Sequence, residues 1–540
     1  MVNDMTSGTE RYWRYCPGIV FLLSFLLFLF LGLSRHWGYL TSINDLGVAD
    51  QAIWGLLNGE FFLNTSQLNR PIVWLGFHFH LIHLLLVPFY YLTPSAIWLI
   101  LAHAISLSLS AVPIYLLARR VLHSEQAGLL WMIAYLMNPT LLNTAAFDFA
   151  PIVLTVPLIS ISLLAVEMAN FRMLTLSVLI ILLCKEHLGV MVAGFGALWW
   201  LQNKRWKTSM LLIILGVMHS ITVMGLIMPK FSPTDTHIMF GDNLDYLSRY
   251  GWLGDSFVEI FQTIVFHPIY TIKMVVLEFS GVKYLAFLLM FFLGFPLAAP
   301  QFILPGIGDL MANMLSFNPL PRSILAYHNV TLVPMLAVAA IYGVKKISHC
   351  SNWINRRSSF QLSFLVLCAS MFSGYFLAPL PLPGARNNFA PKNIFQRPDP
   401  YIETIRQAVG SNASISVQAN IGAHFSQRKR IYRYPNKVGK VDAVILQLES
   451  PTKNINNIPE DLIKERKYLS NVLDGYLQMD RTDYIDSIES IIHEKSYGIL
   501  LWNDPWLVLA RDVNSQGLQK DVERKLKQLR EEWNIIGNND

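Results

Sequence analysis

The stretch GIVFLLSFLLFLFLGLS, from Gly18 to Ser34, decides the fold class of this chain because it contains no charged side chain. An α-helix that crosses the hydrocarbon of a bilayer needs ~17–25 such residues. Arg11 and Arg14 precede the stretch as in a signal peptide, but no small-residue cleavage site follows it. We therefore expect a retained membrane anchor with a cytoplasmic N-terminus.

The composition extends this prediction to most of the chain. Of the 540 residues, 53% are hydrophobic and only 14% are charged, whereas soluble domains carry about 25% charged residues. Apolar runs recur as far as residue 379 and predict a polytopic α-helical membrane protein with about eleven transmembrane helices. The expected spans cover roughly residues 17–35, 95–118, 126–145, 152–170, 173–184, 188–201, 208–228, 283–297, 299–316, 326–344 and 360–379.

The basic residues in the loops predict the orientation of the chain in the membrane. Basic residues cluster at Arg119–Arg120, Lys204–Lys207, Lys345–Lys346 and Arg356–Arg357, and such loops lie in the cytoplasm. This arrangement requires residues 78–91 to lie along the outer membrane surface as an amphipathic juxtamembrane helix. The first outer loop (36–94) and the C-terminal segment then lie outside the cytoplasm, so we expect an integral protein of a bacterial inner membrane.

Residues 1–384 form the expected membrane domain, and residues 385–540 form a small extracytoplasmic α/β domain, because the second segment has no run apolar enough to span. The expected strands are residues 414–418, 430–434, 441–448, 498–502 and 507–510, and the expected helices are residues 460–478, 484–494 and 518–533. The two spans 173–184 and 188–201 are short, and they resemble half-helices that meet at residues 185–187.

Several classes of function lose support. The net charge of +6 is small for this length and resides in loops, so we expect membrane lipids and not nucleic acid as partners. There is no Walker loop, no Gly-x-Gly-x-x-Gly after a strand and no Gly-x-Ser-x-Gly, which argues against nucleotide-driven pumping and serine hydrolysis. The four cysteines lie in or beside apolar segments and imply neither a disulfide framework nor a zinc site.

Acidic residues at the outer surface are the first candidates for chemistry. Asp45 follows the first span, where an acid can act as a general base or hold a metal, although its position also suits a cap for a helix over residues 48–57. Asp148 lies between two apolar spans, and Glu186 lies beside Lys185 and His187 in an apolar region. Ionisable groups at such places are costly and have partners or functions, but a self-contained ion pair or a short polar loop fits Glu186 equally well.

Histidines and arginines give weaker signals. His78, His80 and His83 fall in one surface segment, where a metal site competes with side chains that simply reach water. His328 precedes a span, and the nearby Arg322 is suited to bind a phosphate. The run of residues 427–430 has the composition of a solvated basic turn, with a contact to lipid headgroups or to a substrate phosphate as the alternative.

At this point the chain resembles a bacterial membrane family known as domain of unknown function 2079, which is grouped with the GT-C glycosyltransferases. The resemblance covers nearly the whole chain and rests on Asn44-Asp45-Leu46-Gly47-x-x-Asp50-Gln51-Ala52-x-Trp54, His78-Phe79, Asp148-Phe149, Lys185-Glu186, Tyr327-His328 and His424-Phe425-Ser426-x-Arg428. The chain departs from the family pattern at Ala150, where a histidine is usual, and at His187, where an acid is usual.

The resemblance implies a GT-C-like fold, similar in layout to the aminoarabinose and protein mannosyl transferases. It places a catalytic acid at Asp45 and a second acid, which positions the acceptor or a divalent cation, at Asp148. By the same resemblance Asp50, His78, Lys185, Glu186, Arg322 and His328 are substrate-binding candidates.

The function that follows is transfer of a sugar from a polyprenyl-phosphate donor to an extracytoplasmic acceptor. Two other classes remain open. A transporter or flippase of a lipid-linked or small anionic substrate would use the same buried ions as a path, but it predicts an inverted repeat that the hydropathy does not show. A non-catalytic envelope assembly protein would act through its C-terminal domain.

Overall fold

The structure is a computed structural model that describes residues 15–232, 249–350, 356–385, 395–449, 454–459, 462–494, 496–515 and 517–535. The chain divides into two compact units, each built from several stretches. We call Met1–Leu33, Trp74–Leu85 and Leu99–Phe389 the helical unit. We call Ser34–Val73, Leu86–Trp98 and Ala390–Asp540 the sheet unit, which includes most of the expected first outer loop.

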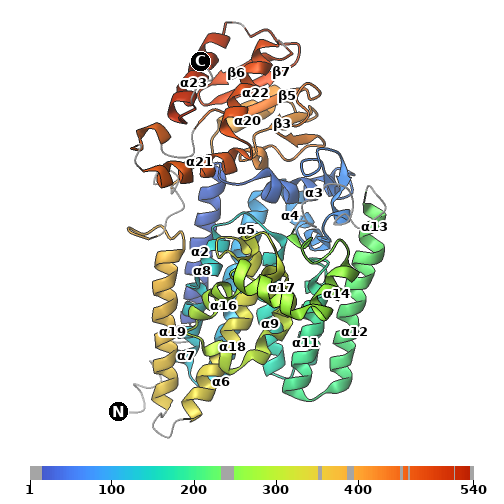
Figure 1. Cartoon of the computed structure of the whole chain (residues 1–540), viewed down its shortest axis with the longest axis vertical. Coiled ribbons are helices and arrows are strands. Elements are labelled where there is room, and N and C mark those ends of the chain that lie inside the picture. The colour runs from blue at the N-terminus through green and yellow to red at the C-terminus, as the bar shows by residue number, and fades with distance from the viewer. Residues whose placement is uncertain are drawn as a thin grey trace. The chain divides into compact units, whose positions relative to one another are not determined.

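Apolar helices form the helical unit (Figure 1). Each expected span coincides with one or two of them, and polar caps set several starts: the side chains of Ser124, Asn170 and Ser256 each accept a backbone N–H at the head of a helix. The helices are α2 (Cys16–Trp37), α5 (Ile97–Leu109), α6 (Ala111–Leu122), α7 (Glu125–Leu136), α8 (Pro139–Ala145), α9 (Val156–Glu167), α10 (Phe171–Ile181), α11 (Leu188–Asn203), α12 (Trp206–Thr222), α13 (Met228–Phe231), α14 (Phe257–Phe266), α15 (Pro268–Lys273), α16 (Gly281–Met290), α17 (Ile307–Leu315), α18 (Leu332–Cys350) and α19 (Arg356–Leu377).

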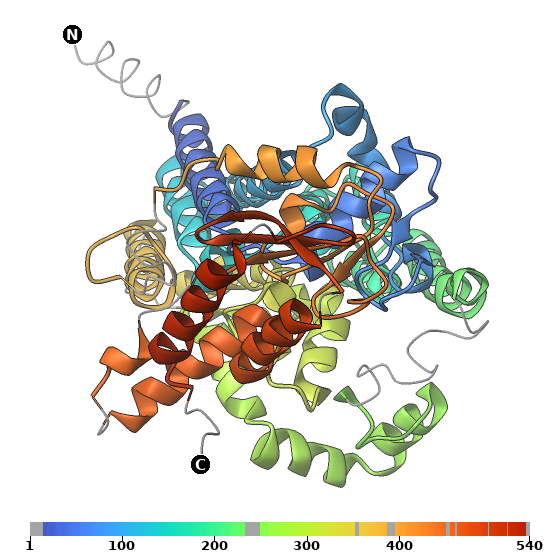
Figure 2. The same ribbon diagram turned by 90° about the horizontal axis from the view of Figure 1, so that it is seen from above.

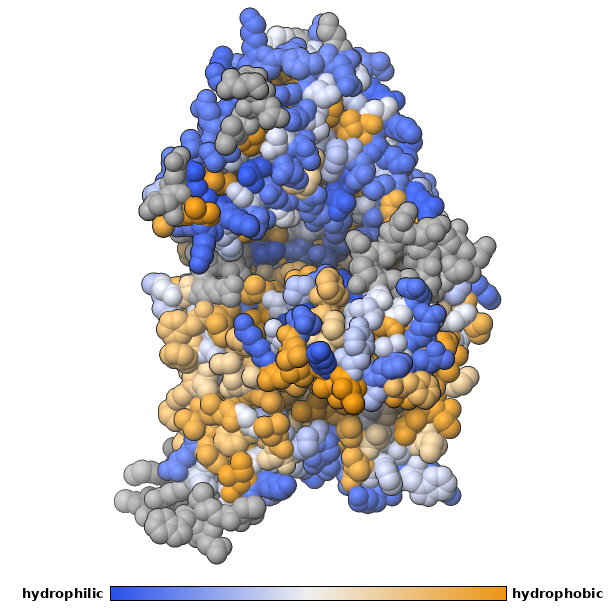
Figure 3. Space-filling model, viewed as in Figure 1, coloured by the Kyte–Doolittle hydropathy of each residue, from blue (hydrophilic) through white to orange (hydrophobic). Residues whose placement is uncertain are grey.

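Four helical segments of the described chain are long and apolar enough to cross a membrane: Cys16–Trp37, Ile97–Leu122, Trp206–Phe231 and Ser358–Leu377. A fifth crossing is added if Val258–Phe266 and Pro268–Glu278, which meet at 91°, act as one span. Other expected spans form shorter apolar helices, so the count of about eleven stays a prediction. The visible side chains over the helical unit are mostly hydrophobic (Figure 3).

The prediction of one amphipathic surface helix over residues 78–91 is wrong, because the segment is not a continuous helix. The segment contains a 3₁₀ turn at Leu81–Leu85 and a short helix α4 at Val87–Leu92, with Pro88 in its first turn. The Ile82 N–H donates to the Leu183 carbonyl at 2.7 Å, which draws the first half of the segment into the helical unit. His80 and His83 are therefore buried and do not reach water.

The sheet unit contains a five-stranded sheet in the order β4-β3-β5-β7-β6. Strands β3 (Ile415–Val417), β4 (Ile431–Arg433) and β5 (Ala443–Gln447) run parallel, whereas β7 (Trp506–Ala510) is antiparallel to both β5 and β6 (Gly498–Asn503). All five strands lie where the alternating β-rich runs predict them. The unit also contains the short antiparallel pair β1 (Leu63–Asn64) and β2 (Ile72–Val73).

Helices cover both faces of this sheet (Figure 2). Val444 and Leu446 of β5 pack toward the core that contains α22 (Arg481–His493) and α23 (Gln519–Glu532). Ala443 and Ile445 pack toward the other core, which contains α20 (Tyr401–Val409). Because successive strand residues face opposite sides, one apolar strand supplies both cores. The helix α21 (Ile463–Leu477) was also predicted, but α20 was not.

Candidate functional site

A cavity of about 360 Å³ lies within the helical unit and gathers residues from distant parts of the chain. Its polar lining comes from His78, the segment 185–187, α17 and the segment before α18. Its apolar lining comes from Ile152, Val190, Met224, Ile260, Ala312 and Leu315. A charged head with an apolar tail is the chemistry that such a lining fits.

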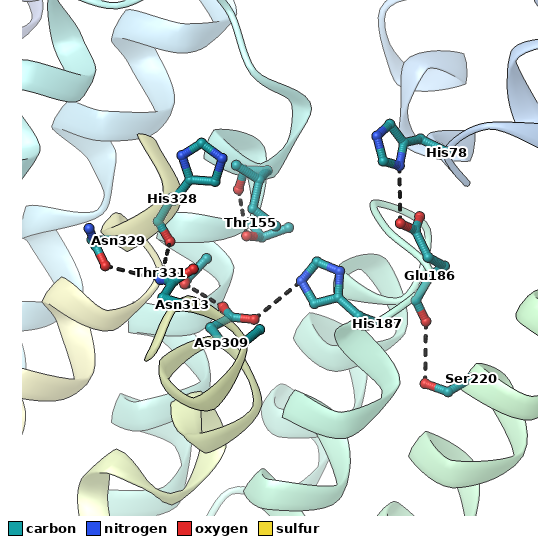
Figure 4. Close-up of polar contacts among 12 residues, drawn as sticks. His78, Thr155, Glu186, His187, Ser220, Asp309, Asn313, His328, Asn329 and Thr331 are labelled. Atoms are coloured by element: carbon teal, nitrogen blue, oxygen red, sulfur yellow. Dashed lines mark hydrogen bonds and ion pairs between the residues drawn. The ribbon is translucent and has the colours of Figure 1, made fainter. Parts of the chain in front are cut away.

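The break between α10 and α11 provides the central part of the site, Lys185-Glu186-His187. Close packing fixes this break, because a Cβ at Gly189 would lie 2.2 Å from the Gly216 carbonyl oxygen of α12. Ser220 of α12 donates a hydrogen bond to the Glu186 carbonyl at 3.3 Å. The polar residues at the head of α11 are therefore held against α12 (Figure 4).

Glu186 is 5% exposed and its carboxylate is fully engaged by one neighbouring segment. His78 Nδ1 lies 3.0 Å from Glu186 Oε1, and the Phe79 N–H donates to Oε2 at 3.1 Å. A carboxylate only accepts, so the proton of this contact resides on His78 Nδ1. The contacts with His78 and with the Phe79 N–H compensate for the hydration that the buried Glu186 carboxylate loses.

The adjacent His187 makes a second pair. Its Nε2 lies 3.2 Å from Asp309 Oδ1, and Thr331 Oγ1 donates to Asp309 Oδ2 at 2.5 Å. The His187 side chain is 40% exposed, in contrast to Glu186. Figure 4 shows the two pairs on opposite sides of the 185–187 segment. Asp309 was not among the predicted site residues, although it is the single acid within the apolar run 299–316, and such an acid is the signal that identifies functional residues.

Three further basic groups line the cavity: Lys185, Arg249 and His328. Within the described part of the chain, the Lys185 ammonium makes no hydrogen bond or ion pair. His328 Nδ1 is buried and also has no hydrogen-bond partner among the described residues. Lys185 and His328 thus bring to the cavity polar groups that no described residue occupies.

His80 and His83 are not part of a group of metal ligands among the described residues. Trp74 Nε1 donates to His80 Nδ1 at 3.0 Å, and the His80 and His83 rings are 5.4 Å apart. Among the described residues, no three His, Cys, Asp or Glu side chains are grouped so that they could hold a metal ion. The divalent cation that the resemblance implies near Asp148 stays a prediction.

Two predicted site residues of the helical unit lie outside the cavity lining. Asp148 is 4% exposed, in the turn between α8 and the 3₁₀ helix Pro151–Thr155, and is not among the described lining residues. Arg322 donates to the Asn313 carbonyl at 3.2 Å and to the Ser316 carbonyl, and its guanidinium stacks over the Phe279 ring. Their roles with substrate stay predictions.

Asp45 belongs to the sheet unit, in the helical turn Ile43–Gly47 that continues into α3 (Val48–Leu57). Its role as a cap for α3 is wrong, because α3 has no side-chain cap and the preceding turn is capped by Ser42. The turn winds into α3 without a break, so no orphan N–H groups are left at Val48.

Asp50 is 1% exposed in the same unit. Its carboxylate accepts hydrogen bonds from Tyr90 at 2.7 Å, Ser426 at 2.6 Å and Gln427 at 3.1 Å. Burial nevertheless raises the pKa of Asp50. These contacts tie α3, α4 and the segment 426–427 together, so substrate binding by Asp50 stays a prediction.

The expected solvated turn at residues 427–430 is wrong for Arg428. This side chain is 3% exposed and donates to the carbonyls of Phe425, Gly410 and Ala413. Burial lowers the pKa of Arg428 to about 10. The carbonyl groups compensate for the lost hydration of the guanidinium.

Comparisons with known proteins bear on the family. Residues 35–480 match the family described as "Predicted membrane protein (DUF2079)". No curated protein matches the chain. Two similar solved structures are ArnT from Cupriavidus metallidurans bound to undecaprenyl phosphate, with a TM-score of 0.47, and the same protein in the apo state, with a TM-score of 0.45. Each is 12% identical in sequence, over 91% of this chain and 97% of that chain. Because the family match covers most of the sequence, the chain belongs to the predicted membrane protein family DUF2079.

Proposed function

We propose that the protein is a membrane glycosyltransferase that moves a sugar from a polyprenyl-phosphate donor to an acceptor hydroxyl outside the cytoplasm. The observation that carries the proposal is the cavity. It combines Lys185, which has no hydrogen bond or ion pair with any described residue, with two His–carboxylate pairs and apolar walls. A lipid-linked sugar has the complementary parts: an apolar chain, an anionic phosphate and a group rich in hydroxyls.

The phosphate is the part that the basic groups would hold. Lys185, Arg249 and His328 line one cavity, and negative charge grows on the phosphate as its bond to the sugar breaks. Fixed cations at that place stabilise the transition state more than the ground state. Apolar residues such as Met224 and Ile260 would contact the first units of the lipid chain.

The proton of the acceptor hydroxyl needs a general base. The resemblance gives this role to Asp45 and gives Asp148 the task of positioning the acceptor or a cation, with Asp50, His78, Glu186 and Arg322 in supporting roles. These assignments are what the resemblance implies, and the proposed transfer does not depend on which residue is the base.

The test is mass spectrometry of lipid-linked sugars and envelope glycans in native host cells that lack the chain, complemented with variants at equal expression. We expect the cells that lack the chain to accumulate donor and lose one glycan. Lys185→Met should behave like the deletion, and Asp45→Asn should do so if Asp45 is the base. The control Lys207→Met changes an exposed lysine at the start of α12 and should restore the glycan.

Other outcomes separate the rival functions. Unchanged glycans and donors in cells without the chain would reject the transferase. Altered donor distribution without loss of a covalent product would favour transport. Loss of function on truncation at about Leu382, with all acid and lysine variants active, would favour an assembly role of the C-terminal segment.

A further inference from the structure

We infer that His187, held by Asp309, is the general base that takes the proton from the acceptor hydroxyl. The inference rests on the proposed function and gives that role to a residue other than Asp45. It comes from the orientation of one imidazole in the cavity and from the different state of its neighbour Glu186.

The contact with Asp309 sets the tautomer of His187. Nε2 lies 3.2 Å from Asp309 Oδ1, and a carboxylate accepts but does not donate, so the proton of the neutral ring resides on Nε2. Nδ1 then carries the lone pair, and the ring, 40% exposed, lines the cavity. A carboxylate behind an imidazole both orients it and stabilises the imidazolium that forms when it accepts a proton.

Asp309 is itself fixed. Thr331 Oγ1 donates to its second oxygen at 2.5 Å. Asp309 also lies in the first turn of α17, where the helix dipole favours a negative charge. Both features keep the carboxylate ionised and aimed at His187.

The other groups in the cavity are less suited to this role. Both oxygens of Glu186 already accept hydrogen bonds, and the residue is 5% exposed. His328 has no carboxylate partner among the described residues, so no such charge would stabilise its imidazolium. Lys185 and Arg249 are cations suited to the phosphate.

The step balances without another reactant. The acceptor O–H bond breaks and its proton moves to His187 Nδ1. The acceptor oxygen forms a bond to the anomeric carbon as the bond from that carbon to the phosphate oxygen breaks. The electron pair of the broken bond leaves with the polyprenyl phosphate, and the added negative charge faces Lys185. Asp309 stabilises the imidazolium that forms at His187.

The experiment uses the purified full-length chain added to membranes from cells that lack it, with the lipid-linked donor accumulated there as the probe. We expect His187→Gln to lower kcat about 100-fold or more with little change in the apparent KM for donor. Asp309→Asn should lower kcat by a smaller factor. Imidazole in solution should restore part of the activity of His187→Ala and none of that of Lys185→Met. The control His493→Gln alters an exposed histidine at the end of α22.

Failure of the inference on His187 and failure of the proposed function give different results. If the intact chain consumes donor and His187→Gln stays within about threefold of it, the base is another residue and the inference is overturned while the function stands. If the intact chain consumes no donor, the proposed function and the inference fall together. A cooperative thermal transition in each variant, matching that of the intact chain, guards against misfolding.

Discussion

Removing His78 should destabilise the protein more than removing its partner's charge. The contact joins His78 Nδ1 to Glu186 Oε1 at 3.0 Å, with side chains 16% and 6% exposed. His78→Phe leaves the buried Glu186 carboxylate with the Phe79 N–H as its one remaining donor among the described residues. Breaking a buried pair from one side costs about 3–5 kcal/mol, and because Glu186 lines the cavity we expect a loss of about 3 kcal/mol.

Glu186→Gln should be much milder. The amide oxygen still accepts from Phe79, and the amide N–H₂ can donate to His78 in its other tautomer, so we expect a loss of about 1 kcal/mol. The double variant His78→Phe/Glu186→Gln has no buried charge at this pair. It should therefore be more stable than His78→Phe alone, by about 1–2 kcal/mol.

The assay is denaturant-induced unfolding of the full-length purified chain in mixed micelles, with all four members of the cycle measured together. The sign of the difference between His78→Phe and the double variant is the decisive result. If the double variant is the less stable of the two, Glu186 does not depend on His78 for its burial, and the reasoning on this pair is refuted.

Three further predictions concern other parts of the chain. Burial lowers the pKa of His424 to about 4, below the usual ~6.5 of histidine. The neutral ring therefore contributes stability that is present above pH ~6.5 and lost as the pH falls toward 4, on the order of 3 kcal/mol. Hydrogen exchange of the β3–β5 amides should show this loss, and His424→Gln should flatten it. Asp50→Ala leaves the donors of Tyr90, Ser426 and Gln427 without their acceptor, so proteolysis of the sheet unit should be faster, at a cost of about 2–4 kcal/mol, whereas Asp504→Ala, at an exposed turn, should change it little. Gly189→Ala should destabilise the contact between α11 and α12, but Gly475→Ala, in open space on α21, should raise the free energy of unfolding by about 0.5–1 kcal/mol.

The sequence alone predicted much of the local structure because periodicity is a local property. Residues 441–448 predicted a strand and contain β5, and the apolar run 208–228 predicted a helix and lies within Trp206–Phe231. Polar residues interrupting an apolar region also marked the segment 185–187, which the structure places at the cavity. These signals need no knowledge of what packs against them.

Two of the wrong predictions, those for His80 and Arg428, fail because both side chains are buried. Their partners, the Trp74 indole for His80 and backbone carbonyls for Arg428, compensate the lost hydration. Hydropathy cannot report a hydrogen-bond partner that the fold supplies.

The spacing of apolar residues is enough to predict a helical membrane protein with an added α/β segment, and Lys185, Glu186 and His328 stand out already in the sequence. Which of these groups meet depends on the packing of the helices. Glu186 pairs with a histidine 108 positions away, and His187 pairs with Asp309 of another helix. The physical reason is that helix formation follows from the spacing of apolar residues along the chain, whereas an ion pair depends on how helices pack, here through the close contact of Gly189 with Gly216.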